Sequence, residues 1–106
     1  MQITKKRVTA AIEAARFPND LGEKLEVELQ TNLAFLNFWW STKPSAVLSI
    51  WLSTALICIA DDDVSDDEML DAVLRFVTAL FDDFEQFAIA KLAVLELKKK
   101  IGSRAA

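Results

Sequence analysis

Hydrophobic residues recur mostly at intervals of three or four along this chain, with polar residues between them. That interval places side chains on one face of an α-helix. A first stripe, within residues 4–17, consists of Val8, Ala11, Ile12 and Ala15. A second stripe, within residues 21–41, consists of Leu25, Leu29, Leu33, Leu36 and Trp40. The pattern therefore predicts two amphipathic helices in the N-terminal half of the chain.

Turn and capping residues mark where these helices begin and end. Thr4 can cap the first helix, and Asn19 or Asp20 can cap the second. Residues 41–44 suit a turn, and Pro44 suits the first position of a third helix. The chain contains only two glycines and two prolines, which leaves room for few turns and favours a few long elements.

The third predicted helix, over residues 45–60, carries no charged side chain. A helix that is apolar on nearly every side is buried either in protein or in lipid. The uncharged run from Pro44 to Ala60 is seventeen residues long, at the lower edge of the roughly 17–25 residues that span a membrane. Hydroxyl side chains dilute the run, and three aspartates follow it. A central helix in a bundle is therefore the preferred interpretation, and a membrane-active protein that inserts residues 44–60 is the alternative.

The fourth predicted helix begins with the strongest local signal in the chain. Ser65 can accept a hydrogen bond from the third helical N–H, and Glu68 can reach back to the cap, which makes a capping box. From there, apolar residues fill three to four of every seven positions up to about Ile101. The lysines at 98–100 suit the negative end of a helix dipole.

The length of this fourth helix predicts self-association. A helix of about 35 residues spans roughly 50 Å, which is longer than a compact monomer of this size. A second copy would cover the excess apolar surface most simply, and such dimers are most often two-fold symmetric. A break near Asp82 and Asp83 would weaken this argument. The expected fold is a single all-α domain over residues 1–106, a four-helix bundle with a long C-terminal helix, which forms a homodimer.

The composition argues against several functions, namely nucleic-acid binding, histidine-dependent catalysis or zinc binding, and an internal disulfide. The formal net charge of −4 argues against binding nucleic acid, whose phosphates require a positive surface. The chain has no histidine, the commonest general base and zinc ligand. Cys58 is the only cysteine, so no internal disulfide forms, and its place in an apolar helix predicts that it is buried. These features are typical of an acidic, cytoplasmic protein without a cofactor.

An acidic cluster between Asp61 and Asp71 raises the question of a metal site. A calcium-binding EF-hand loop requires glycine at its sixth position and glutamate at its twelfth. Counted from Asp61, these positions hold Asp66 and Ala72. We therefore interpret the cluster as a solvated loop followed by a helix cap, and expect no metal.

The adjacent Trp39 and Trp40 are the most distinctive feature of the sequence. Adjacent helix side chains point about 100° apart, so both rings lie in the core only if the helix is enclosed over a wide arc. The other possibility is that one ring is an exposed anchor, because tryptophan is enriched at binding hot spots. Asp83 interrupts an apolar column of the fourth helix and is a further candidate contact. The predicted partner-binding residues are Phe35, Trp39, Trp40, Phe76, Asp83 and Phe87.

Together, these features predict a small non-enzymatic protein that acts by binding the surface of another protein. Adaptors, chaperones and inhibitors, among them phage-encoded inhibitors and immunity proteins, are often small, acidic and helical, which is an analogy of class alone. Besides the membrane-active alternative, a helical bundle that holds an apolar ligand among Trp39, Trp51 and Phe84 is a further alternative.

Overall fold

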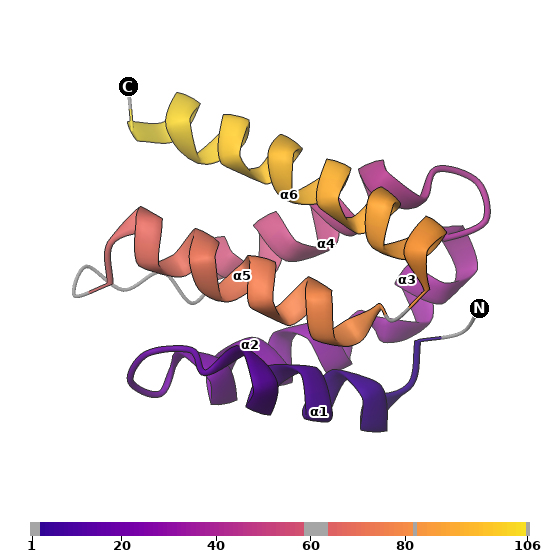
Figure 1. The fold of residues 1–106 in the computed structure, drawn as a ribbon, viewed down its shortest axis with the longest axis horizontal. Helices are drawn as coiled ribbons and strands as arrows, with labels where there is room; N and C mark the ends of the chain where they lie inside the picture. Colours follow the sequence, from indigo (N-terminus) through magenta and orange to yellow (C-terminus); the bar gives the residue numbers. More distant parts are fainter. Residues whose placement is uncertain (1–2, 59–63, 82, 106) are drawn as a thin grey trace.

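The computed structural model describes residues 3–58, 64–81 and 83–105, and these residues form six α-helices and no strand (Figure 1). The predicted all-α fold is therefore confirmed. The helices are α1 Lys5–Ala15, α2 Leu21–Thr31, α3 Leu33–Trp39, α4 Pro44–Cys58, α5 Asp66–Leu80 and α6 Phe84–Ala105. Two of the four predicted helices are each divided in two, so the predicted number of helices is wrong.

The helices pack in layers. In Figure 1, α1 and α2 lie at the bottom, α4 and α5 in the middle and α6 at the top, while α3 lies at the right-hand end. The most extensive packing is between α1 and α5 and between α4 and α6. The molecule measures 35 × 27 × 23 Å, with a radius of gyration of 12.6 Å, as expected for a compact chain of this length.

The uncharged helix α4 supplies much of the core. It contacts α2, α3 and α6. Its buried side chains are Val47, Leu48, Ser49, Trp51, Leu52, Ala55 and Leu56. The apolar residues of α4 are thus buried against other helices. This burial accounts for the uncharged sequence that had made membrane insertion of residues 44–60 an alternative. None of the helices within the described ranges is long and apolar enough to cross a membrane.

Two arginines tie α1 and α5 together. The helices run in opposite directions (Figure 1). The guanidinium of Arg7 donates to the carbonyl of Leu80, the last residue of α5. Likewise, Arg75 Nε donates at 2.7 Å to the carbonyl of Ala15, the last residue of α1. Carbonyls at a helix C-terminus lack intrahelical donors and lie at the negative end of the dipole, so a guanidinium is a favourable partner for each.

The second predicted helix is interrupted at Asn32, where φ is −108° and ψ is 15°. The buried indole of Trp51 donates through Nε1 to the carbonyl of Leu29 at 3.3 Å. The N–H of Asn32 donates to the same carbonyl at 3.2 Å. These two donors take the place of the N–H that would continue the helix, so α2 ends and α3 begins as a separate element.

The fourth predicted helix is interrupted between Leu80 and Phe84. Phe81 adopts an extended backbone, with φ −115° and ψ 107°, and its side chain is buried. Asp83 Oδ1 accepts a hydrogen bond from the N–H of Gln86 at 3.2 Å and so caps the start of α6. The chain turns back, and α6 packs on α4 and α5 (Figure 1). The expected continuous helix of roughly 50 Å is thus wrong, and its length no longer supports a dimer.

The predictions for three helix starts are confirmed, whereas Asp20, at the N-cap position of α2, makes no side-chain capping hydrogen bond. Thr4 Oγ1 accepts from the N–H of Arg7 at 3.2 Å. Ser65 Oγ accepts from the N–H of Glu68 at 3.2 Å. Pro44 is the first residue of α4. The acidic run 61–63, which the sequence places before the Ser65 cap, lies outside the described residues.

We expect Phe76→Ala to lower the free energy of unfolding by about 3–5 kcal/mol, because it leaves a cavity in the core. Phe76 is fully buried, and its ring lies 6.4 Å from that of Phe17. Chemical denaturation followed by circular dichroism measures the loss. Leu74→Ala, at a position 40% exposed on the same helix, is the control and should cost much less. Equal losses in both variants would contradict this placement of Phe76.

Removing one of the arginine ties should also weaken the fold. We expect Arg75→Met to lower the free energy of unfolding by about 1 kcal/mol, since the carbonyl of Ala15 loses its charged donor. Lys6→Met, which removes a positive charge from an exposed site on α1, should leave the unfolding curve nearly unchanged. If both variants unfold at the same denaturant concentration, the hydrogen bond contributes nothing measurable.

Candidate protein-binding surface

One side of the short helix α3 is fixed to the body of the protein. Leu36 is fully buried. Asn37 Oδ1 accepts from the N–H of Ile3 at 2.9 Å, and Asn37 Nδ2 donates to the Ile3 carbonyl at 2.8 Å. Trp40, which directly follows the helix, stacks on Phe81 with ring centroids 5.4 Å apart and 12° between the planes. These contacts set the orientation of α3 and decide which of its side chains face solvent.

Three large aromatic side chains occupy the outer side of α3, and we call them the aromatic surface: Phe35, Phe38 and Trp39. Their exposed fractions are 49%, 71% and 43%. The indole of Trp39 lies 6.4 Å from the ring of Phe35 and 5.0 Å from that of Phe38, the latter edge to face at 82°. These contacts join the rings into one continuous patch, and contiguous exposed apolar patches mark interaction sites.

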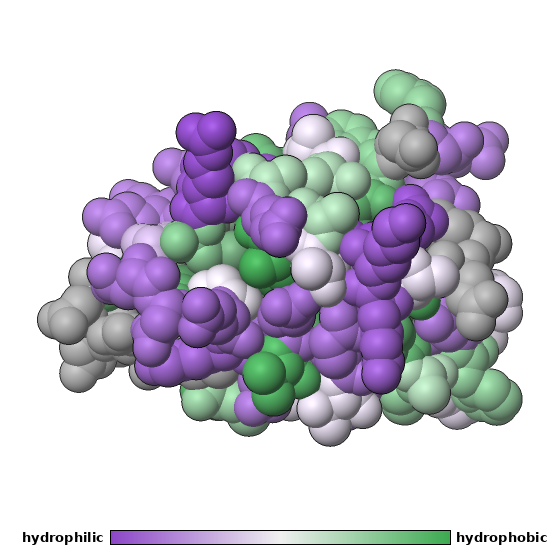
Figure 2. Space-filling model, turned by 90° about the horizontal axis from the view of Figure 1, so that it is seen from below, coloured by the Kyte–Doolittle hydropathy of each residue, from purple (hydrophilic) through white to green (hydrophobic). Residues whose placement is uncertain are grey.

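The aromatic surface carries no charge of its own, because α3 has the sequence LAFLNFW. Figure 2 views the molecule from below and shows a mainly hydrophilic face over α1 and α2, with hydrophobic side chains scattered among the polar ones. Apolar contact, and not charge, is therefore what this surface offers.

The structure distinguishes between the two interpretations of the tryptophan pair. Trp39 points outward with its neighbours Phe35 and Phe38, whereas Trp40 is 9% exposed and stacked in the core. Phe76 is also fully buried. The prediction that Trp40 and Phe76 contact a partner is corrected accordingly, because neither presents surface to bind. Phe38, the most exposed of the three rings, is not among the residues predicted to bind a partner.

The two remaining predicted residues, Asp83 and Phe87, lie together at the start of α6. Asp83 is exposed, and its carboxylate is engaged in capping α6, which explains why an aspartate interrupts an otherwise apolar column. Phe87 is half-buried. Both line a shallow hollow of about 340 Å³ whose other walls are Thr78, Phe81 and Phe84. The structure thus places these two residues on α6, whereas the rings of the aromatic surface lie on α3.

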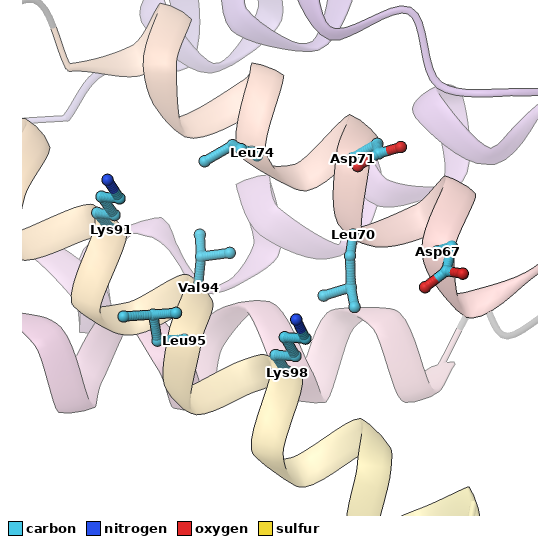
Figure 3. Close-up of a pocket in the computed structure, with 8 residues that line it drawn as sticks. All are labelled: Asp67, Leu70, Asp71, Leu74, Lys91, Val94, Leu95 and Lys98. Carbon is cyan, nitrogen blue, oxygen red and sulfur yellow. The ribbon is translucent and has the colours of Figure 1, made fainter.

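Between α5 and α6 lies a groove of about 420 Å³ that the sequence pattern did not reveal (Figure 3). Its apolar lining is Leu70, Leu74, Val94 and Leu95. Aspartates 67 and 71 stand on the α5 side, and lysines 91 and 98 stand on the α6 side. No ion pair crosses the groove among the residues that the structure describes. The groove exists only because α6 turns back beside α5, which a continuous helix would not have allowed.

Cys58 lies at the end of α4 and is exposed, so the prediction that it is buried is wrong. In the part of the chain that the structure describes, no group of three or more potential metal ligands is placed to hold an ion.

The exposure of the three tryptophans leads to a spectroscopic prediction. Trp39 is 43% exposed, whereas Trp40 and Trp51 are 9% and 3% exposed. Iodide, a charged quencher confined to the surface, should therefore quench mainly Trp39, and Trp39→Phe should remove most of the quenchable fluorescence. Trp51→Phe should leave the quenchable fraction almost unchanged. Equal quenching in both variants would contradict the orientation of α3.

Comparison of the chain with models of known protein families, with curated proteins and with solved structures returns no match.

Proposed function

We propose that this protein is a small cytoplasmic interaction protein, an adaptor, chaperone or inhibitor without enzymatic activity, which binds a partner protein through the aromatic surface on α3. The observation that carries the proposal is the cluster of Phe35, Phe38 and Trp39, three mutually contacting rings that are 43–71% exposed. Tryptophan and other aromatic residues are enriched at hot spots, where a few side chains supply most of the binding free energy.

The contacts on the inner side of α3 hold these rings in a fixed orientation. This favours a binding role for the rings over exposure without a function. The Asn37–Ile3 hydrogen bonds and the Trp40–Phe81 stack hold α3 from behind. A partner would therefore meet rings that are already ordered, and less conformational entropy is lost on association. The absence of charge on α3 means that the partner site is an apolar cleft, and binding should depend only weakly on salt.

The other functional alternatives receive less support. Membrane insertion of residues 44–60 would require α4 to withdraw Leu48, Trp51 and Leu52 from the core, where all three are buried. An apolar ligand held among Trp39, Trp51 and Phe84 would need these side chains to share a cavity. Trp51 is buried against α2, and Phe84 is 84% exposed at the start of α6.

We also propose that the protein forms a homodimer, on grounds different from helix length. The outer side of α6 exposes large apolar side chains, Phe84, Leu92 and Leu95. This surface belongs to a different helix from the aromatic surface, so self-association and partner binding can occur together. A two-fold dimer would present two aromatic surfaces to its partners.

The proposed partner-binding role is tested by a double substitution in the aromatic surface. We expect Phe38→Ser with Trp39→Ser to abolish capture of the proteins that the wild-type chain retains from a lysate of its source organism. The reason is that the variant loses most of the apolar contact area. Quantitative mass spectrometry of the retained proteins measures the effect.

Val27→Ser is the matched control, because Val27 is a large apolar residue on α2 that is 64% exposed. This variant should retain the same proteins as the wild type. Because all three substituted side chains are on the surface, both variants should keep the wild-type circular dichroism spectrum. Retention of the same proteins by the double variant would refute the proposed role of the aromatic surface.

A further inference from the structure

The outer side of α6 carries an apolar stripe, which we define as Phe84, Ala88, Leu92 and Leu95. All four residues are exposed, Phe84 by 84%, Leu92 by 55% and Leu95 by 50%. At about 100° per residue they fall within an arc of about 80°, on the side opposite the buried residues of the helix. Those buried residues are Ala90, Ala93 and Leu97. α6 therefore has two apolar sides, and only one of them is covered within the molecule.

Lysines border one side of the apolar stripe and glutamates border the other. One turn past Leu95, Lys99 falls in the same arc, where it ends the stripe and lies 3.7 Å from the carboxylate of Glu96. Lys91 and Lys98 lie on the side toward α5, where they line the groove in Figure 3. Glu85 and Glu96 lie about 140° away around the helix, on the opposite border. All four side chains are exposed. Lys91 precedes Leu92 directly and Glu96 follows Leu95 directly, so these residues occupy the g, a, d and e positions of a heptad.

We propose that α6 pairs in parallel with α6 of a second copy of this chain, about a two-fold axis that runs along the helices. In this arrangement the apolar stripes face each other. The lysine border of each helix then faces the glutamate border of its partner, and Lys91 lies near Glu96 of the partner subunit. A two-fold axis perpendicular to the helices would instead place lysines against lysines and glutamates against glutamates. The distribution of charge thus favours a second copy of this chain as the partner of the stripe, and it favours parallel packing of the two helices.

The size of the stripe determines how strong the dimer is. From Phe84 to Leu95 the helix rises only about 17 Å, and one short helix from each subunit buries less than the roughly 1,200–2,000 Å² of a standard stable interface. We therefore expect a reversible dimer that dissociates in the micromolar range. This inference rests on the homodimer of the proposed function and is independent of the aromatic surface.

Sedimentation equilibrium over a concentration series from about 1 µM to about 1 mM tests the proposal. The wild-type mass should rise from that of the monomer to that of the dimer. Leu92→Glu places a charge within the stripe and should keep the chain monomeric throughout, whereas Val27→Glu on α2 should dimerise as the wild type does. A monomeric wild-type chain at all concentrations, or a dimer unaffected by Leu92→Glu, would overturn the proposal.

Charge reversal tests the contact between the two borders. The variants K91E/K98E and E85K/E96K should each dimerise at least tenfold more weakly than the wild type, because like charges then face each other on both sides. An equimolar mixture of the two should recover dimerisation as a heterodimer, since opposite charges meet again. A mixture that stays monomeric contradicts the facing of these borders.

Cross-linking tests the direction of packing. In a Cys58→Ser background, Leu95→Cys should form a disulfide dimer, because a parallel pair brings the two positions together. In an antiparallel pair centred on the stripe, the two cysteines would lie about 16 Å apart along the helices, beyond the reach of a disulfide. Failure to cross-link in a sample that sediments as a dimer overturns the parallel arrangement.

The variant F38S/W39S separates this inference from the proposed function. It should dimerise with the wild-type constant while losing the captured partners. If instead it abolishes dimerisation, the aromatic surface is the self-association site and the assignment to α6 is wrong.

Discussion

The rings of Trp40 and Phe81 stack where the end of α3 meets the end of α5, with 12° between their planes. The stack buries the second indole of the tryptophan pair and Phe81, the extended residue that directly follows α5. Since Trp40 is held inward, Trp39 and its neighbours on α3 face solvent. Since Phe81 is held inward, the chain turns back after Leu80 and lays α6 beside α5. Both surfaces to which we assign binding therefore depend on this contact between two distant parts of the chain.

Apolar surface is unevenly distributed on this protein, and that distribution carries the functional argument. The aromatic surface on α3 is uncharged and rigidly supported, whereas the stripe on α6 is bordered by lysines on one side and glutamates on the other. An uncharged patch suits an apolar cleft in a different protein. A patch with opposite charges on its two borders suits a copy of itself, because two-fold symmetry then places each lysine border against a glutamate border.

The predicted partner-binding residues show what the helical spacing of apolar residues can and cannot predict. The tryptophan pair and its aromatic neighbours predict Phe35 and Trp39 as partner contacts, and these two side chains lie together on the surface. Trp40 and Phe76 share the same apolar spacing but are buried, because helical periodicity marks an apolar face without stating whether that face meets the core or a partner. Asp83 was noticed for interrupting an apolar column. Gln86 three residues later makes an N-cap pattern that would have indicated a helix start there.

The sequence by itself determined the all-α class, the caps at Thr4 and Ser65, and the absence of histidine chemistry, because these follow from residue type and from neighbours within one helical turn. The tertiary structure alone decided where the long apolar runs end and which rings face outward. The Leu29 carbonyl accepts a hydrogen bond from Trp51, 22 residues away. Phe81 packs against Trp40, which directly follows α3. Such long-range contacts override local helix propensity, and no pattern confined to one segment contains them.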